Sequence, residues 1–133
     1  MEWWTIGTQP SGTIVGTSDT QTLTNKRITS RVVSTASSAT PTPDVSTTDI
    51  YVLTALAAAA AFGIPTGTPV NGTKLLIRVK DDGTARALTW NAIYRAIGVT
   101  LPTTTVISKT LYLGMMYNST DTKWDVLAVG QEV

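Results

Sequence analysis

The nine acidic residues are the side chains of this sequence best suited to chemistry. A glycosidase needs two carboxyl groups facing each other across a cleft at roughly 5 to 9 Å. Here they are scattered, at Glu2, Asp19, Asp44, Asp49, Asp81, Asp82, Asp121, Asp125 and Glu132. Several stand at expected turns or strand ends, where Asp is a common structural choice. Because the chain also has no His, which is the commonest general base, we predict that it is not an enzyme.

Metal and phosphate sites find little support in the residue types. The chain has neither Cys nor His, so thiolate and imidazole ligands are excluded. Oxygen ligands for calcium are conceivable at Asp81–Gly83, although a solvated turn is the simpler interpretation. Gly67 and Gly72 stand five apart like the glycines of a phosphate-binding loop, but Thr73–Lys74 then follows where such a loop needs Lys before Ser or Thr. No cofactor or metal is expected.

Aromatic and polar side chains in the second half of the chain offer two further candidates. A sugar-stacking platform is conceivable from Trp90, Tyr94, Tyr112, Tyr117 and Trp124. Since these alternate with Ala, Leu and Val at strand positions, most are expected in the core, with Tyr117 and Trp124 pairing across two strands. A possible receptor-facing loop holds Asn118, Ser119, Asp121 and Lys123.

Strands must position these side chains, and the clearest strand lies within residues 74–90, KLLIRVKDDGTARALTW. Leu75, Ile77 and Val79 recur at every second position, the period of a strand with one buried face. The Asp-Asp-Gly sequence that follows suits a tight turn. We therefore expect a hairpin in which residues 84–90 form the returning strand.

The remaining pattern predicts a mainly β protein. Further strands are expected at residues 49–56, 105–108, 111–117 and 124–129. Short strands separated by turn signals are typical of a β-sandwich or partly closed barrel. We predict a small antiparallel β-sandwich, jelly-roll-like, over residues 47–133, preceded by an extended N-terminal arm and connector over residues 1–46.

Two segments leave alternatives open. Residues 34–48, STASSATPTPDVSTT, contain Pro41 and Pro43, which bias the chain toward extended structure. This segment is either a connector or extended edge, or a disordered linker. The run Ala57–Ala61 is either a short helical turn, because Ala has the highest helix propensity, or an extended segment where small side chains let another backbone approach.

The composition restricts the partners. Charged residues make up only 14% of the chain and the net charge is +1, which gives no electrostatic drive toward nucleic acid or an anionic membrane. No apolar run approaches the roughly 20 residues that cross a bilayer, and the start MEWWTIGTQ lacks the regions of a signal peptide. We expect no nucleic-acid partner, no membrane insertion, and a protein kept inside a cell or assembled there into something larger.

The N-terminal residues include an unusual apolar cluster. Trp3, Trp4 and Ile6 lie at the end of the chain, where exposed indoles would promote association unless something covers them. They either pack onto the protein's own core or form an anchor that inserts into a groove on a larger assembly or a sister subunit, since Trp is enriched at interface hot spots. Leu23 and Ile28 are the main apolar points of the polar segment that follows.

Two stretches resemble proteins of tailed bacteriophages. The sequence SDTQTLTNKRI is similar to the TDTQTLTNKTL-type element that recurs in their tail fibres, tail proteins and other appendages. Residues 49–131 resemble a C-terminal domain of many phage and prophage structural proteins. The stretches that carry this resemblance are IYVLTALAAAA, PTGTPVNGTKLLIRVKDDGTARALTWNAIYR, LPTTT and KTLYLGMMYNSTDTKWDVLAVGQ.

The resemblance implies a virion structural or host-attachment protein that is commonly trimeric. Only about 48 residues precede the similar domain, which favours a short spike, head fibre or capsid decoration protein over a long fibre. We therefore expect a homotrimer in the virion, docked to phage capsid or tail proteins through its N-terminal arm. The alternative is a tail-fibre receptor-binding module that recognises a host surface glycan.

Overall fold

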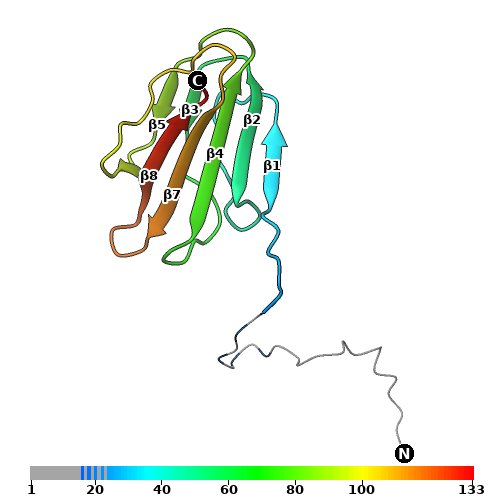
Figure 1. Ribbon diagram of the computed structural model, residues 1–133. Coiled ribbons are helices and arrows are strands. Elements are labelled where there is room, and N and C mark those ends of the chain that lie inside the picture. Colours follow the sequence, from blue (N-terminus) through cyan, green and yellow to red (C-terminus); the bar gives the residue numbers. More distant parts are fainter. Residues whose placement is uncertain (1–15, 17, 19, 21, 23) are drawn as a thin grey trace, which may run out of the picture.

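The computed structural model describes residues 16, 18, 20, 22 and 24–133 of the chain (Figure 1). These residues form strands and no helix, which confirms the prediction of a mainly β fold. The strands are β1 (Val32–Thr35), β2 (Ile50–Leu56), β3 (Ala60–Phe62), β4 (Lys74–Asp81), β5 (Leu88–Trp90), β6 (Tyr94–Ala96), β7 (Leu111–Asn118) and β8 (Lys123–Gln131). In the described part of the chain, no helix is long and apolar enough to cross a membrane.

Six strands form one sheet in the order β1-β2-β4-β7-β8-β6. The β4–β7 and β7–β8 pairs are antiparallel, and the last of these is the hairpin expected around the polar loop at residues 119–122. The β1–β2, β2–β4 and β6–β8 pairs are parallel, so the sheet is mixed and not purely antiparallel as predicted. Parallel neighbours are possible here because long connections, such as residues 36–49 and 57–73, carry the chain back to the starting edge.

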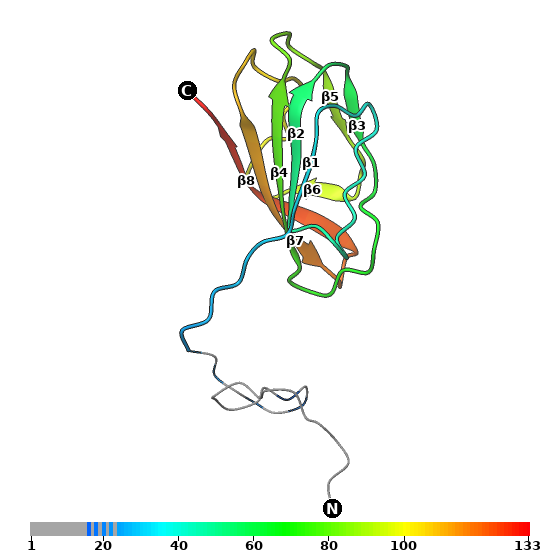
Figure 2. The same cartoon turned by 90° about the vertical axis from the view of Figure 1, so that its right-hand side faces the viewer.

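A second, smaller layer covers one face of this sheet (Figure 2). Its centre is the parallel pair β3–β5. Residues 39–43 lie beside β3, since Ala61 and Gly63 donate their N–H groups to the carbonyls of Ala39 and Pro41. The segment 34–48 is therefore an ordered extended edge in place of a free linker, and β1 already belongs to the main sheet within the part predicted as arm and connector.

The predicted hairpin over residues 74–90 is wrong in its second half. β4 forms as expected, but both of its edges are occupied, by β2 on one side and β7 on the other. After the turn the chain crosses to the second layer, where β5 pairs with β3. A two-residue period identifies a strand with one buried face but does not specify its neighbours, and the stacking of Trp90 on Phe62, with ring centroids 4.2 Å apart, favours the β3–β5 pair.

The structure also decides the conformation of the alanine run and of residues 105–108. The alanine run is extended: Ala60 and Ala61 belong to β3, and Ala60 donates its N–H to the Ala87 carbonyl. The strand predicted at residues 105–108 does not form. Thr104 makes only an isolated bridge with Ala87, and the chain then turns at Ser108, whose φ is positive.

The hydrophobic core lies between the two layers. Its large fully buried side chains are Leu53, Leu56, Phe62, Leu75, Ile77, Val79, Leu88, Leu113, Trp124 and Val126. They come from strands of both sheets, and alternate residues of β4 and β7 point to the other face. That other face of the main sheet has no second layer in the described part of the chain (Figure 2).

Candidate functional site

The uncovered face of the main sheet carries a row of apolar residues. The strand register places Val32, Ile50, Leu76, Gly114 and Ala128 side by side across β1, β2, β4, β7 and β8. Ile50, Leu76, Gly114 and Ala128 are each sequence neighbours of a residue that packs in or against the core, so alternation directs them to the outer face. Val32 extends the row onto the edge strand β1. The row therefore forms an apolar band across five of the six strands.

A β-bulge in β8 adds a further apolar side chain to this face. Gly114 pairs with Ala128 and Met115 with Val126, so Leu127 is an extra residue on β8. Bulges re-aim side chains in this way. Both Leu127 and Ala128 are exposed, and the Leu127 side chain is 50% exposed. Two successive apolar residues thus lie on the outer face, where simple alternation would bury one of them.

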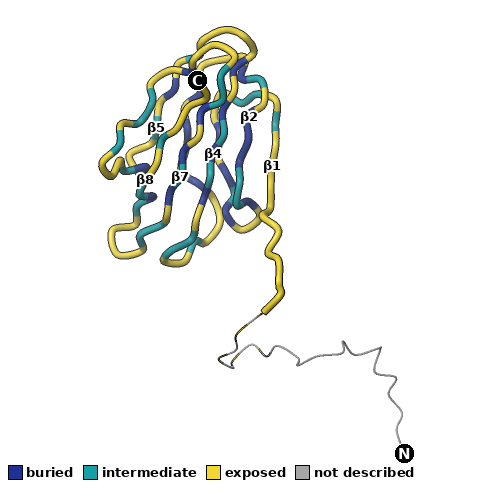
Figure 3. The backbone as a smooth tube through the Cα atoms, viewed as in Figure 1, coloured by how far each residue is buried: buried dark blue, intermediate teal, exposed yellow. Residues whose placement is uncertain are grey.

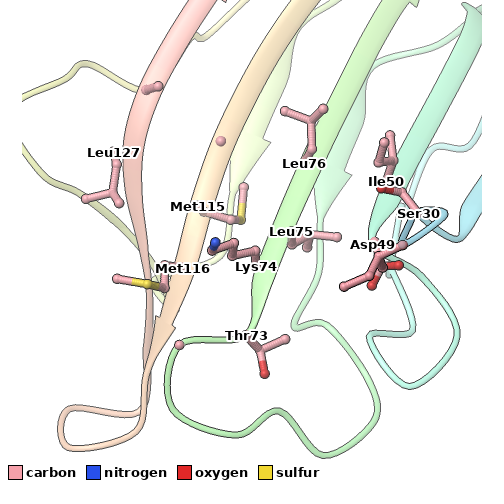
Figure 4. Close-up of a pocket in the computed structure, with 14 residues that line it drawn as sticks. Ser30, Asp49, Ile50, Thr73, Lys74, Leu75, Leu76, Met115, Met116 and Leu127 are labelled. Atoms are coloured by element: carbon pink, nitrogen blue, oxygen red, sulfur yellow. The ribbon is translucent and has the colours of Figure 1, made fainter. Parts of the chain in front are cut away.

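The outer face is hollowed into a groove of about 940 Å³ (Figure 4). Its residues come from the arm, the start of β2, β4 and the middle of β7 and β8. Ile50, Leu76, Met116 and Leu127 provide its large apolar side chains, and Thr73, Lys74 and Asp49 add polar groups at one end. The colouring by exposure in Figure 3 shows intermediate and exposed residues along these strands among the buried ones.

The smallest side chains of the row lie on β7 and β8, where they leave space for the groove. Gly114 and Ala128 face each other on β7 and β8. Gly114 does not have a positive φ, and a Cβ added to it would lie 3.8 Å from the Ala128 Cβ, an ordinary contact. Its own fold therefore does not require glycine here. Glycine inside a strand weakens the strand and often marks a place where another backbone or a ligand approaches closely.

The N-terminal arm joins the body at one end of this groove. Arg31 donates hydrogen bonds from its backbone N–H and its guanidinium to the Asp49 carboxylate, with an ion-pair distance of 2.6 Å. These bonds lower the pKa of Asp49 to about 2. Arg31 also donates to the Ser46 carbonyl. We call Arg31 with Asp49 the arm root, because it fixes the chain where the arm begins.

The arm residues predicted for assembly lie mostly beyond the root. Trp3, Trp4, Ile6 and Leu23 fall outside the described residues. Ile28 is described: it is 92% exposed and, with Ser30, lines the groove. The described residues 24–31 lead away from the body (Figures 1 and 2). An almost fully exposed isoleucine beside an open apolar groove is the main unpartnered apolar feature of this region.

The loop predicted to face a receptor lies at the same end of the sheet as the arm root (Figure 1). Its polar groups bond to one another and to neighbouring segments. The Asn118 amide donates to Asp121 over 3.3 Å, and its carbonyl oxygen accepts the backbone N–H of Thr120 over 3.0 Å. Ser119 donates its N–H to Asn71, and Lys123 donates to the Ala92 carbonyl over 2.8 Å. The four predicted residues are thus brought together in a turn whose polar groups are bonded within the turn and to Asn71 and Ala92.

Arg95 on β6 holds this loop from the side. Its guanidinium lies 2.9 Å from Asp121 and 2.7 Å from Asp125. The hydrogen bonds from Arg95, and to a lesser degree the one from Asn118, hold the pKa of Asp125 below its ordinary value. Both carboxylates are therefore paired with the same guanidinium, whose single positive charge offsets one of their two negative charges.

The aromatic residues divide as expected, with one exception. Trp124 and Tyr94 are buried, and Trp90 and Tyr117 are partly buried against the core. The predicted Tyr117–Trp124 pair forms across β7 and β8 with ring centroids 5.2 Å apart. Tyr112 is exposed on the outer face. The arrangement provides no continuous aromatic platform among the described residues.

The turn after β4 has a structural role. Asp81 is 3% exposed and its Oδ1 accepts N–H groups from Gly83 and Ser108. Burial raises the pKa of Asp81, but these hydrogen bonds outweigh it, and the pKa lies below its ordinary value. Asp82 pairs with Arg86 over 2.7 Å. Among the described residues, no group of three or more metal-ligating side chains is close enough to hold a metal ion.

The first glycine of the rejected phosphate motif, Gly67, has a local explanation. Gly67 has a φ of 86°, a left-handed conformation that favours glycine. A Cβ there would lie 2.8 Å from the Asp44 carboxylate and 2.9 Å from the Ser46 nitrogen. Gly67 is thus needed for close packing between two connections, which leaves no cradle for a phosphate at this position.

Sequence reasoning missed the groove. Leu76, Met116 and Leu127 occur in expected strands, but their outward direction depends on register and on the bulge. The available signal was Gly114 in the middle of the apolar strand LYLGMMY, since glycine is unfavourable there without a local reason. In comparisons with known proteins, no family model, no curated protein and no solved structure matches the chain.

Proposed function

We propose that this chain is a non-enzymatic structural subunit of a phage virion, a short trimeric spike, head fibre or capsid decoration protein held by its N-terminal arm. The observation that carries the proposal is the 92% exposed Ile28, on an arm that leaves the body beside an uncovered apolar sheet face. Large uncovered apolar surfaces mark sites of association. The resemblance of SDTQTLTNKRI to phage appendage elements supplies the class of assembly.

The distribution of bonded polar groups supports a structural role over a catalytic one. The described carboxylates with the strongest interactions, Asp49, Asp82 and Asp125, are each paired with an arginine. A paired carboxylate is held ionised and is a weak proton donor or acceptor. Repeated attachment of identical subunits through weak arms gives avidity beyond any single contact.

A glycan-binding tail-fibre module remains the second candidate, and loop geometry argues against it. The Asn118–Lys123 loop lies at the arm end of the body (Figure 1), so a particle held by the arm would face this loop. Its Asn118 side chain already bonds to Asp121 and to the Thr120 backbone, and Asp121 is also paired with Arg95. Binding of the full chain to a glycan array, lost on Asp121→Ala, would support this candidate over the structural one.

Incorporation into particles tests the proposal. A phage that encodes the chain without Met1–Gly7 is purified, and its particles are compared with wild type by mass spectrometry and by imaging. We expect the shortened chain to be made and folded but absent from particles. Its full incorporation would contradict attachment through the arm, and wild-type particles lacking the protein would contradict the virion role altogether.

A further inference from the structure

We propose that the groove on the outer sheet face receives the N-terminal segment Met1–Gly7 of a second copy of this chain. The inference deepens the proposed function and rests on it, because it names the partner of the arm as a sister subunit. The groove is built from described residues of β2, β4, β7 and β8 (Figure 4), and the segment is the part of the chain that carries Trp3, Trp4 and Ile6.

The shape of the groove indicates an extended peptide as its occupant. Its floor includes its smallest residues, Gly114 and Ala128, with Leu76 on the neighbouring strand β4 and Leu127 next to Ala128 on β8. Gly114 has room for a Cβ in the isolated chain, 3.8 Å from its nearest neighbour. A strand glycine that its own fold does not need is explained when a second backbone or a flat ring lies directly on it.

The chemistry of the groove fits indole and isoleucine side chains. Its walls are aliphatic and thioether groups, from Ile50, Leu76, Met116 and Leu127. Methionine side chains adapt to irregular partners and make favourable contacts with aromatic rings. Lys74, whose amino group lies near Met116, and Asp49, on the β2 side of the groove, add polar groups (Figure 4). The charged start of a peptide can stay in water beside them. Tryptophan buried in such a pocket is a typical interface hot spot.

The direction of the arm favours a neighbouring copy over the same chain. Residues 24–31 lead away from the body (Figures 1 and 2), and Ile28 makes almost no contact with it. The 24 residues from Trp4 to Ile28 span at most about 80 Å. The sheet from β1 to β8 is only about 19 Å wide at 4.8 Å per strand, so the groove of an adjacent subunit lies within reach.

Disulfide trapping in the full chain tests this inference, since the sequence has no cysteine. Thr5→Cys and Leu127→Cys chains, distinguishable by a tag, are co-expressed, purified and mildly oxidised. We expect a disulfide between the two different chains, identified by mass spectrometry of the linked peptides. Ile64→Cys replaces Leu127→Cys as the matched control, because Ile64 is similarly exposed, 55% against 50%, but lies outside the groove; it should give at least tenfold less product.

Substitutions that fill the groove provide a second test. Gly114→Val, with Ala128→Val as an independent variant, fills the groove and should lower the yield of the mixed disulfide at least tenfold while the thermal transition of the protein is retained. Equal yields with Leu127→Cys and Ile64→Cys, or no effect of both filling variants, would overturn the proposal. A predominant disulfide between two Leu127→Cys chains would also overturn it, because it would indicate two outer faces packed together. So would a disulfide that forms only within one chain when both substitutions are placed in that chain.

The inference and the proposed function fail separately. Absence of the mixed disulfide together with loss of particle incorporation on deletion of Met1–Gly7 overturns only the sister-subunit groove, because the arm then binds another virion protein. A specific mixed disulfide in a protein that is absent from purified particles overturns only the virion role.

Discussion

The two faces of the six-stranded sheet carry neighbouring apolar rows that are filled in opposite ways. On the inner face, Tyr51, Ile77, Leu113 and Val129 lie side by side and are covered by the second layer. One residue along the strands, the outer row has Ile50, Leu76, Gly114 and Ala128 and no cover among the described residues. The inner row is built of large side chains, whereas the outer row has its smallest ones, Gly114 and Ala128, on β7 and β8.

This difference separates two uses of apolar surface in one sheet. The inner row is complete, because its side chains meet partners within the same chain and exclude water. The outer row keeps a hollow that no described segment fills. Substitutions on the inner face should therefore change folding stability, and substitutions on the outer face should change association.

The largest effect is expected from a cavity on the inner face. Leu113→Ala removes a fully buried side chain from the middle of β7, and such substitutions cost about 2–5 kcal/mol of unfolding free energy. Its neighbour Tyr112, which points outward, provides the control, since Tyr112→Ala should cost less than about 1 kcal/mol. Urea unfolding monitored by tryptophan fluorescence measures both, and equal losses would remove the distinction between the faces.

A smaller loss is expected from the buried carboxylate at the end of the inner face. Asp81→Ala leaves the N–H groups of Gly83 and Ser108 without their acceptor, which costs about 1–3 kcal/mol. Asp82→Ala removes only a partly exposed ion pair with Arg86, for which about 0–1 kcal/mol is typical. A cost for Asp82→Ala that exceeds that of Asp81→Ala would contradict the structural role of the buried residue.

The same carboxylate predicts a pH dependence. The pKa of Asp81 is lowered in the folded protein, so its stabilising contribution is present above the ordinary Asp value of about 4 and is lost as pH falls below that value. Unfolding free energy should therefore fall from pH 5 toward pH 3, and Asp81→Ala should reduce the steepness of this fall. An unchanged slope in the variant would assign the acid sensitivity to other carboxylates.

The Phe62–Trp90 ring stack helps to hold the second layer together, so its removal should destabilise the protein. Trp90→Leu removes the ring that lies 4.2 Å from Phe62 and the indole N–H that donates to the Pro102 carbonyl over 2.8 Å. Together we expect a loss of about 1–2 kcal/mol. Thermal unfolding of the variant measures it, and a loss below about 0.3 kcal/mol would mean that the stack contributes little to holding the layer.

The smallest expected change in unfolding free energy is a gain in stability. Gly114→Ala places a methyl group in ordinary contact with Ala128 and reduces the freedom of the unfolded chain, which stabilises by about 0.4–1 kcal/mol where the backbone permits it. Its unfolding free energy should rise while association through the groove weakens. Destabilisation would instead show that the fold itself requires glycine at this position.

The strands that were found correctly from sequence have strong local signals. β2, β4, β7 and β8 combine β-branched or aromatic residues with a two-residue period or a clear polar loop, as at residues 118–123. β1 was missed because VVST lies in a small, polar stretch whose extended form depends on pairing with β2. Local pattern therefore located most of the main sheet, whereas strand order required tertiary contacts.

The candidate site was less predictable for a related reason. Its Ile28 was identified from the sequence. The outward direction of Leu76 and Leu127, however, depends on the register across β4, β7 and β8 and on one bulge. A bulge shifts every later residue of a strand to the opposite face. No residue in the sequence VLAVG predicts the bulge. The Asn118–Lys123 loop is likewise paired with Arg95, which is remote in sequence.

The direction in which the arm meets β1 has a mechanical consequence. β1 runs parallel to β2 from its first residue, and the arm leaves the body from that end of the strand (Figure 1). Traction on the arm therefore loads the β1–β2 hydrogen bonds in shear, where they share the force, and does not peel them one at a time. The Arg31–Asp49 pair lies where that force enters the body. Detaching β1 from β2 by pulling on the arm should therefore take more force than the four-residue length of β1 suggests.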